Sequence, residues 1–355
     1  MKYTFEITIA GCSTRCDHCY VDGGPASNME AAVYERCINK LKHILANVDG
    51  DISLTLGNEI YCHPDIGRII EYTADIMPQY FSFENQPAPT TGIALLERTD
   101  RDDIIKQLKL VNANGFMLAV HGAEDTHDKI VHRRGARSKL FEAADYFANN
   151  GLFIFFNLII SKNLCAEFEK VACKIKQYPN AETGFTVPLY VPTKRMRMYQ
   201  NIRAEYDDCV KLAAQAERCG FDTSGLKKIC ESANEQEIIS QLRSDGFCYE
   251  REKEKAVQWK FFNVVQNGDI FYGNVGAHTK YIGNLFETAD EKLIKEITSM
   301  EANYDYTAYY SDEAFRWLEN NISQIPAREH NYVYKTKEEC IYALLDEMGI
   351  KNALL

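Results

Sequence analysis

The chain has 355 residues, of which 46% are apolar and 12% aromatic. This length predicts one large domain with a smaller one, and the apolar content can bury a substantial core, which excludes disorder over most of the chain. Acidic residues outnumber basic ones by 51 − 40 = 11, which argues against nucleic acid or an anionic membrane as a partner.

The sequence shows neither a targeting segment nor a membrane span. The longest apolar stretch, residues 152–160, contains Asn157 and is too short to cross a bilayer. The first residues alternate between polar and apolar side chains, unlike the apolar run of a signal peptide. We therefore expect a cytoplasmic protein. Its 12 cysteines cannot form a disulfide framework in a reducing compartment, so some of them are expected to bind metal or take part in chemistry.

The first 220 residues alternate between strand-like and helix-like periods. Residues 4–10 place Phe5, Ile7 and Ile9 on one face, which predicts a strand. The capping-box spacing of Ser27 and Glu30 predicts the start of a helix. Further strands are predicted at 52–56, 80–84, 116–120, 152–158 and 184–189, and further helices at 64–76, 101–111, 138–149, 164–177 and 204–219. Six strands alternating with six helices predict an α/β fold with parallel strands, and we favour a partial (β/α)6 TIM-like barrel over an open sheet.

The pattern changes after residue 225. Residues 226–259 are highly charged and predict a solvated helical connector. The turn Asn267–Gly268–Asp269 between two strand-like runs predicts a β-hairpin, and helices are predicted near 290–300, 312–321 and 337–348. We therefore expect three parts: a barrel domain, the connector, and a smaller C-terminal α+β domain, at residues 1–225, 226–259 and 260–355.

Three cysteines follow the first predicted strand at close spacing: Cys12, Cys16 and Cys19. Their tight loop favours a polynuclear iron–sulfur centre over structural zinc, because structural zinc requires four protein ligands and no fourth Cys or His lies at a suitable spacing. Three ligands leave one iron with an open position for a substrate or cofactor. An incomplete zinc site or a chance grouping of loop cysteines is the alternative.

At these residues the sequence resembles the radical S-adenosylmethionine (radical SAM) superfamily. The resemblance implies a [4Fe–4S] cluster on Cys12, Cys16 and Cys19, with S-adenosylmethionine on the open iron. Reductive cleavage would then give a 5′-deoxyadenosyl radical that abstracts a hydrogen atom from the substrate. It also implies an electron donor such as flavodoxin or ferredoxin. His18 stands where the superfamily has an aromatic residue; we expect its backbone to contact adenine and its side chain to point away from the cluster.

The turn after the second predicted strand extends the resemblance. Gly57-Asn58-Glu59 stands where the superfamily has Gly-Gly-Glu, a turn that receives the methionyl ammonium. Asn58 departs from that pattern, but asparagine tolerates positive φ better than other residues that carry a side chain. We expect all three residues to bind the cofactor.

Residues 120–128 resemble a segment of the peptide- and sulfatase-modifying branch of the superfamily. His127 and Asp128 match that segment, whereas Ala119 replaces a serine that would contact the methionyl carboxylate. His121 replaces an aspartate and is expected either to face the cofactor or to pack in the core.

Three more residues complete the cofactor site that the resemblance implies. The branch's arginine is displaced to Arg133 or Arg134, and we favour Arg134 as the clamp on the methionyl carboxylate, a solvated basic turn being the alternative. Asn157 corresponds to an asparagine that contacts ribose. Val187 lies on the sixth predicted strand, whose backbone is expected to pass along adenine.

The C-terminal hairpin and the Ile282-Gly283-Asn284 turn resemble the SPASM and twitch extensions, which hold auxiliary clusters. Closely spaced cysteines do not accompany this hairpin, so we interpret the extension as degenerate and without clusters. Four later cysteines are widely spread and could bind a second cluster only if the fold gathers them: Cys209, Cys219, Cys230 and Cys248.

The leading hypothesis is a radical SAM enzyme that modifies a peptide. Without an auxiliary electron acceptor, epimerisation or rearrangement is favoured over oxidative cross-linking. Two alternatives remain: a radical SAM enzyme acting on a small molecule such as an aminoglycoside or nucleoside, and a non-catalytic metal-binding module. No catalytic side chain is assigned from the sequence.

Overall fold

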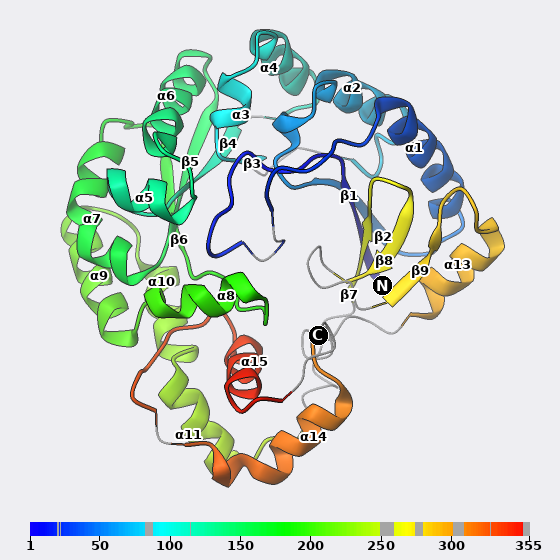
Figure 1. Ribbon diagram of the computed structural model, residues 1–355. Helices are drawn as coiled ribbons and strands as arrows, with labels where there is room; N and C mark the ends of the chain where they lie inside the picture. Colours follow the sequence, from blue (N-terminus) through cyan, green and yellow to red (C-terminus); the bar gives the residue numbers. More distant parts are fainter. Residues whose placement is uncertain are drawn as a thin grey trace.

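The strands form a curved wall with most of the helices on its outer side (Figure 1). A computed structural model describes residues 1–19, 21, 23–81, 88–113, 115–248, 259–273, 280–300, 309–326 and 328–350. Among the described helices, none is long and apolar enough to cross a membrane.

Two sheets make up the wall. The first has the order β2-β1-β7-β8-β9 and consists of β1 (Lys2–Thr8), β2 (Asp51–Gly57), β7 (Trp259–Val264), β8 (Asp269–Tyr272) and β9 (Lys280–Asn284). The second has the order β3-β4-β5-β6 and consists of β3 (Ala88–Thr90), β4 (Gly115–Val120), β5 (Phe153–Ile159) and β6 (Glu182–Thr186).

Strands β1 to β6 are parallel to their neighbours within each sheet. Where the two sheets approach each other, the Leu54 amide of β2 donates a hydrogen bond of 2.8 Å to the Tyr80 carbonyl. The predicted α/β class and partial TIM-like barrel are confirmed.

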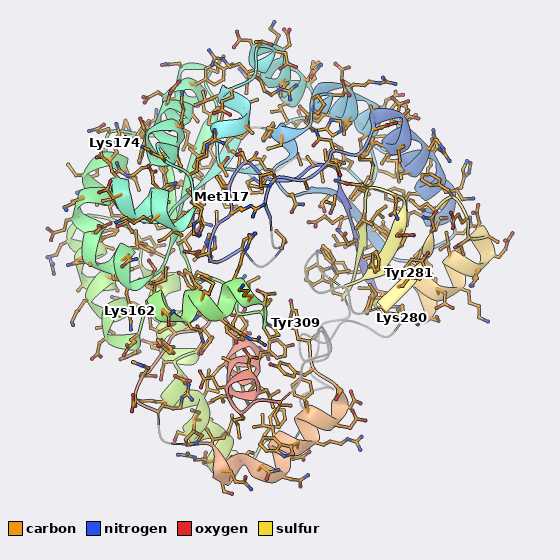
Figure 2. All side chains as sticks on the ribbon, in the orientation of Figure 1. Met117, Lys162, Lys174, Lys280, Tyr281 and Tyr309 are labelled. Carbon is orange, nitrogen blue, oxygen red and sulfur yellow. The ribbon has the colours of Figure 1, made fainter. Side chains whose placement is uncertain are left out.

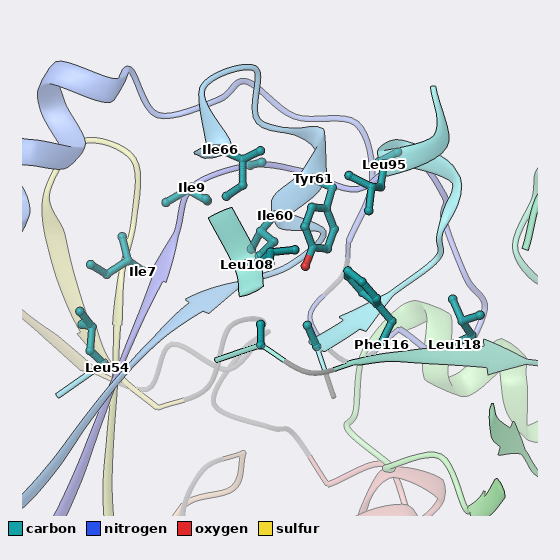
Figure 3. Packing of buried hydrophobic residues seen from close by; sticks show 14 of the residues in the cluster. Ile7, Ile9, Leu54, Ile60, Tyr61, Ile66, Leu95, Leu108, Phe116 and Leu118 are labelled. Atoms are coloured by element: carbon teal, nitrogen blue, oxygen red, sulfur yellow. The ribbon is translucent and has the colours of Figure 1, made fainter. Parts of the chain in front are cut away.

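The helices that follow the barrel strands cover their outer side (Figure 1). They are α1 (Ala31–Leu45), α2 (Ile66–Ile76), α3 (Ile93–Leu96), α4 (Arg101–Leu110), α5 (Glu124–Ile130), α6 (Ala136–Asn149), α7 (Lys162–Ile175) and α9 (Tyr206–Arg218). Helix α8 (Lys194–Tyr199) lies instead next to the second core described below (Figure 1). Phe5 and Ile7 of β1 are fully buried against the covering helices, as are Leu118 and Phe156 of the second sheet. Figure 3 shows part of this core, with Ile7 and Leu54 on one side and Phe116 and Leu118 on the other.

A second core lies below the barrel in Figure 1. It joins helix α8 to α11 (Glu235–Asp245), α14 (Asp312–Asn321) and α15 (Lys337–Glu347). Two further helices belong to the barrel core, α10 (Ser224–Ser232) through Leu226 and α13 (Asp290–Ser299) through Leu293.

Two predictions of local structure in the first part of the chain are wrong. The strand expected at 80–84 is not formed at residues 80 and 81, which lie in a turn and an irregular segment. Residues 82–84 lie outside the described residues. The third described strand is β3, at Ala88–Thr90. The capping box does not form, because the Ser27 hydroxyl donates to Gln266 and α1 begins at Ala31 without a side-chain cap.

The segment after residue 225 is helical, but the described part is not a solvated connector. Helices α10 and α11 each bury one face: Leu226 and Cys230 enter the barrel core, and Ile238 and Leu242 enter the second core. The high charge content of α10 and α11 led to the prediction of solvated helices, although each helix has an apolar face.

The predicted hairpin of β7 and β8 is confirmed. Its first strand also pairs with β1 in parallel, so that Glu6 lies opposite Asn263. The C-terminal hairpin therefore continues the barrel sheet. The domain boundaries given above remain predictions.

Candidate functional site

The segments that follow the parallel strands meet at one edge of the barrel, because the carboxyl ends of parallel strands point the same way. The cysteine loop follows β1, the Gly57–Glu59 turn ends β2, and His121 follows β4. Asn157 lies near the end of β5, and Val187 directly follows β6.

Backbone hydrogen bonds hold the cysteine loop in place. The Cys12 amide donates to the Gly24 carbonyl at 2.7 Å, and the amides of Arg15 and Asp17 donate to the carbonyls of Val131 and Ile130 at 3.1 and 2.9 Å. The loop is therefore anchored to the C-terminal end of α5, the helix that follows β4 of the second sheet.

The three sulfur atoms have polar contacts suited to thiolates. The Thr14 hydroxyl lies 3.2 Å from the Sγ of Cys12 and 3.5 Å from that of Cys16, and the Gly23 amide donates to the Sγ of Cys19 at 3.1 Å. Burial raises the pKa of the Cys12 thiol and raises that of Cys16 to about 12. Such thiols ionise when a metal binds, since the cation compensates for the lost hydration of the thiolate.

Several buried polar atoms around this loop have no hydrogen-bond partner among the described residues. They are the Oγ of Ser13, the Nδ1 of His18 and the Oδ1 of Asn58. Buried polar atoms are nearly always paired in native proteins, so three orphans beside three grouped thiols fit a loop built around a bound group. The residues present therefore fit an iron–sulfur cluster with a polar cofactor beside it.

His18 does not point away from the cysteines as expected. Its ring lies 4.6 Å from that of His121, centroid to centroid. One ligand atom from each of Cys16, His18 and His121 lies within 4.8 Å of the other two. Burial lowers the pKa of His18 to about 4 and lowers that of His121 well below its usual value, so both rings are neutral at pH 7. They meet because the loop after β1 folds over the end of β4.

The Gly57–Glu59 turn has the geometry expected of it. Asn58 adopts a left-handed conformation, with φ of 64°, and its Nδ2 donates to the Ala10 carbonyl at 3.2 Å, which ties the turn to the cysteine loop.

Glu59 is buried, and its carboxylate accepts hydrogen bonds from the Thr90 hydroxyl at 2.8 Å and the Thr91 amide at 2.6 Å. Burial raises its pKa. A bound ammonium group would counteract that desolvation, which is the chemistry expected at this position.

The remaining predicted residues differ in their surroundings. The Asn157 Oδ1 accepts a hydrogen bond of 2.5 Å from the Thr186 hydroxyl, and Val187 is buried in the barrel core. The Arg134 side chain is exposed, whereas Arg133 donates to the Ser13 carbonyl in the cysteine loop at 3.4 Å and also pairs with Glu97. Among the described residues, Arg133 is thus the one of the two that hydrogen-bonds to the loop.

Two of the four later cysteines, Cys209 and Cys230, contact each other. The Cys209 thiol of α9 hydrogen-bonds with those of Cys165 on α7 and Cys230 on α10, and all three are buried in the barrel core. Their binding of a second cluster remains untested.

Sequence reasoning missed a pair of residues on the inner side of the barrel. The Asn263 Nδ2 of β7 lies 3.4 Å from the Glu6 Oε1 of β1 and 3.1 Å from the Thr8 Oγ1. Burial raises the pKa of Glu6 to about 7. The polar positions of the first strand were visible in the alternation, but their pairing with a strand more than 250 residues away left no local signal.

Comparisons with known proteins agree with this geometry. Residues 7–172 match the radical SAM superfamily. A comparison with curated proteins gave no match.

Among solved structures, the chain resembles native anSMEcpe with bound AdoMet and the Cp18Cys peptide, at 12% identity and a TM-score of 0.52, over 98% of this chain and 96% of that one. It also resembles Streptococcus suis SuiB bound to the precursor peptide SuiA, at 13% identity and a TM-score of 0.51, over 84% of this chain and 66% of that one. A structure of BtrN in complex with AdoMet and 2-DOIA has a TM-score of only 0.37, too low to support an argument. At these identities the likeness concerns the fold.

The superfamily match covers the cysteine loop, the Gly57–Glu59 turn and strands β2 to β5. Residues 7–172 therefore form a radical SAM domain, and the chain is an enzyme. Domains of this superfamily use a [4Fe–4S] cluster and S-adenosylmethionine.

Proposed function

We propose that this enzyme abstracts a hydrogen atom from a peptide substrate held against the inner side of the barrel. The observation that carries the proposal is the meeting of the cysteine loop, the Gly57–Glu59 turn and the end of β5 at one edge of the barrel. Bound together, the cluster and S-adenosylmethionine supply a radical able to take a hydrogen atom from an unactivated C–H bond.

The chain's own residues bind and orient the two groups. Cys12, Cys16 and Cys19 hold the iron, Glu59 accepts the methionyl ammonium, and Asn58 fixes the turn against the cysteine loop. His18, His121, Asn157 and Val187 complete the proposed cofactor site, together with Arg134, for whose clamping role Arg133 is the competing residue.

Two observations favour a peptide as the substrate. The solved structures named above hold the Cp18Cys peptide and the precursor peptide SuiA. In this chain, the inner face of the first sheet also carries exposed aromatic side chains, Trp259 at 39% and Tyr281 at 53% exposure, and solvent-exposed aromatic residues are frequent at peptide-binding surfaces.

The test is a reaction of the reconstituted enzyme with S-adenosylmethionine and dithionite, followed by measurement of 5′-deoxyadenosine. We expect this product together with about four irons per chain. A Cys12/Cys16/Cys19→Ala variant should contain almost no iron and form no 5′-deoxyadenosine. Failure of the iron-loaded enzyme to form 5′-deoxyadenosine would contradict the proposal, and substantial iron in the variant would show a second cluster.

The same assay addresses the partners. A reduced flavodoxin or ferredoxin in place of dithionite should sustain the reaction if it is the donor, and the exposed Arg15 and Lys129 near the cysteine loop are suited to an acidic protein of this kind. If an aminoglycoside or nucleoside increases the formation of 5′-deoxyadenosine and no peptide does, the chain is instead a small-molecule enzyme. Deuterium uptake without a change in composition would identify epimerisation.

A further inference from the structure

A single row of side chains crosses the inner face of the first sheet. Strand register places Glu6 beside Thr55 on one side and Asn263 on the other, and continues the row through Phe271 to Tyr281. Solvent reaches this face, because Thr55 is exposed and Tyr281, labelled on β9 in Figure 2, is 53% exposed.

The face is distinct from the core. Phe5 and Ile7, the neighbours of Glu6 along β1, are fully buried on the opposite, helix-covered face. Alternation along the strand therefore turns Glu6 toward the interior of the barrel.

Within the described residues, Glu6 is a carboxyl group without a basic partner. Its side-chain contact is the long hydrogen bond of 3.4 Å from Asn263. Burial raises its pKa to about 7. A half-buried carboxylate in this position gains from any cation that reaches it.

The surroundings of Glu6 would also attract a cation. Trp259 and Phe261 lie on the same face of β7 as Asn263, and the rings of Phe271 and Tyr281 are 5.5 Å apart. Aromatic faces attract ammonium and guanidinium groups. A carboxylate beside aromatic rings thus selects for a basic side chain over an apolar or acidic one.

The row also lies next to the proposed cofactor site. Gly57, which opens the Gly57–Glu59 turn, packs so closely on Glu6 that a Cβ atom added there would lie 2.8 Å from the Glu6 carboxyl carbon. The glycine therefore leaves room for the Glu6 side chain directly beside the cofactor turn.

We propose that Glu6 is a specificity-determining residue that binds the ammonium or guanidinium group of a basic side chain in the peptide substrate. This inference rests on the proposed function, since it defines the class of peptide that the same site accepts.

The experiment uses Trp259 as a fluorescent reporter. Its indole Nε1 donates a hydrogen bond of 3.0 Å to the hydroxyl of Thr4, which lies two residues before Glu6 on the same face of β1. The chain has 2 tryptophans, so Trp317→Phe leaves Trp259 as the only one. Quenching of its fluorescence is titrated with two blocked pentapeptides, Ala-Ala-Lys-Ala-Ala and the same peptide with norleucine in place of lysine.

We expect the lysine peptide to bind at least about tenfold more tightly than the norleucine peptide, a difference that one desolvated ion pair can supply. Glu6→Gln, which keeps the shape of the side chain, should abolish the difference and leave the norleucine peptide unaffected. Glu231→Gln, the same change on the exposed face of α10, should retain it.

Equal binding of the two peptides to the parent protein, no saturable quenching by the lysine peptide, or discrimination that persists in Glu6→Gln would each overturn the inference. Formation of 5′-deoxyadenosine is measured on the same preparations. If the protein forms 5′-deoxyadenosine but binds the two peptides equally, only the inference about Glu6 is refuted. If it prefers the lysine peptide but forms no 5′-deoxyadenosine, the proposed function is refuted.

Discussion

Asn58 occupies a left-handed backbone conformation and also connects two parts of the cofactor site. Its φ is 64°, and its amide group donates to the Ala10 carbonyl. Alanine would keep the strained conformation, which costs about 1–2 kcal/mol outside glycine and asparagine, and would lose the hydrogen bond.

We therefore expect Asn58→Ala to lower the free energy of unfolding by about 1–3 kcal/mol and to reduce the iron content after reconstitution. Anaerobic urea unfolding and iron analysis measure the two effects. Asn112→Ala is the matched control, because Asn112 has a φ of 58° at the end of α4, outside the cysteine loop. It should lose stability but retain iron, and equal iron loss in both variants would refute a specific role for Asn58.

The sequence predicted those residues of the candidate site whose neighbours in space are also their neighbours in sequence. The cysteine loop and the Gly57–Glu59 turn fall into this class, because their positions depend on one strand end each. Glu6 and Asn263 do not, because their contact joins β1 to β7, which are neighbours in the sheet but lie more than 250 residues apart in the sequence. The proximity of His18 to His121 was missed for the same reason.

Helix α8 connects the second core to the cysteine loop. Its first turn is capped by Thr193, whose hydroxyl accepts a hydrogen bond from the Met196 amide. Arg195 of this helix donates to the Gly23 carbonyl at 2.5 Å, and the Gly23 amide donates to the Sγ of Cys19. Arg195 thus orients the residue that hydrogen-bonds one of the three sulfurs.

We expect Arg195→Met to accelerate the loss of iron to a chelator about tenfold, the effect of one lost charged hydrogen bond. The time course of iron release under anaerobic conditions measures it. Arg197→Met is the control, two residues further along α8. It removes an ion pair with Asp346 and leaves the contact with the cysteine loop intact, so this variant should release iron at the parental rate. Identical rates in all three proteins would exclude this role of α8.

The elements themselves were predictable where one face is clearly apolar. Strands β1, β2, β4 and β5 appear within two residues of their predicted bounds, because alternating or continuous apolar runs mark them. β3 was misplaced, since its sequence Ala88-Pro89-Thr90 has no apolar run. Helices α10 and α11 were read as solvated because their charged residues outnumber the few that enter the cores.

At the scale of the molecule, the two cores are connected by buried polar groups as well as by apolar contact. Glu339 of α15 accepts hydrogen bonds from the Tyr190 amide at 3.1 Å and the Lys335 amide at 3.3 Å. Tyr190 lies three residues after Val187 on the segment that leaves β6. A buried carboxyl therefore joins the C-terminal helix to the barrel.

This connection makes stability depend on pH. Burial raises the pKa of Glu339 from 4.5 to about 7, despite the favourable charges of Arg203 and Lys335. Between these two values the folded chain binds a proton that the unfolded chain has lost, so its contribution to stability is complete below about pH 4.5 and is lost as the pH rises through 7.

Glu339→Gln cannot ionise, so we expect the parent protein to lose up to about 3 kcal/mol more stability than this variant between pH 5 and pH 8. Anaerobic urea unfolding at the two pH values measures it, and the comparison with the parent cancels the similar contribution of Glu6. Glu338→Gln removes the neighbouring carboxyl, which is not buried, and should follow the parent protein. Curves for Glu339→Gln that run parallel to the parental ones would show that Glu339 is ionised in the fold, with Arg203 and Lys335 compensating its charge.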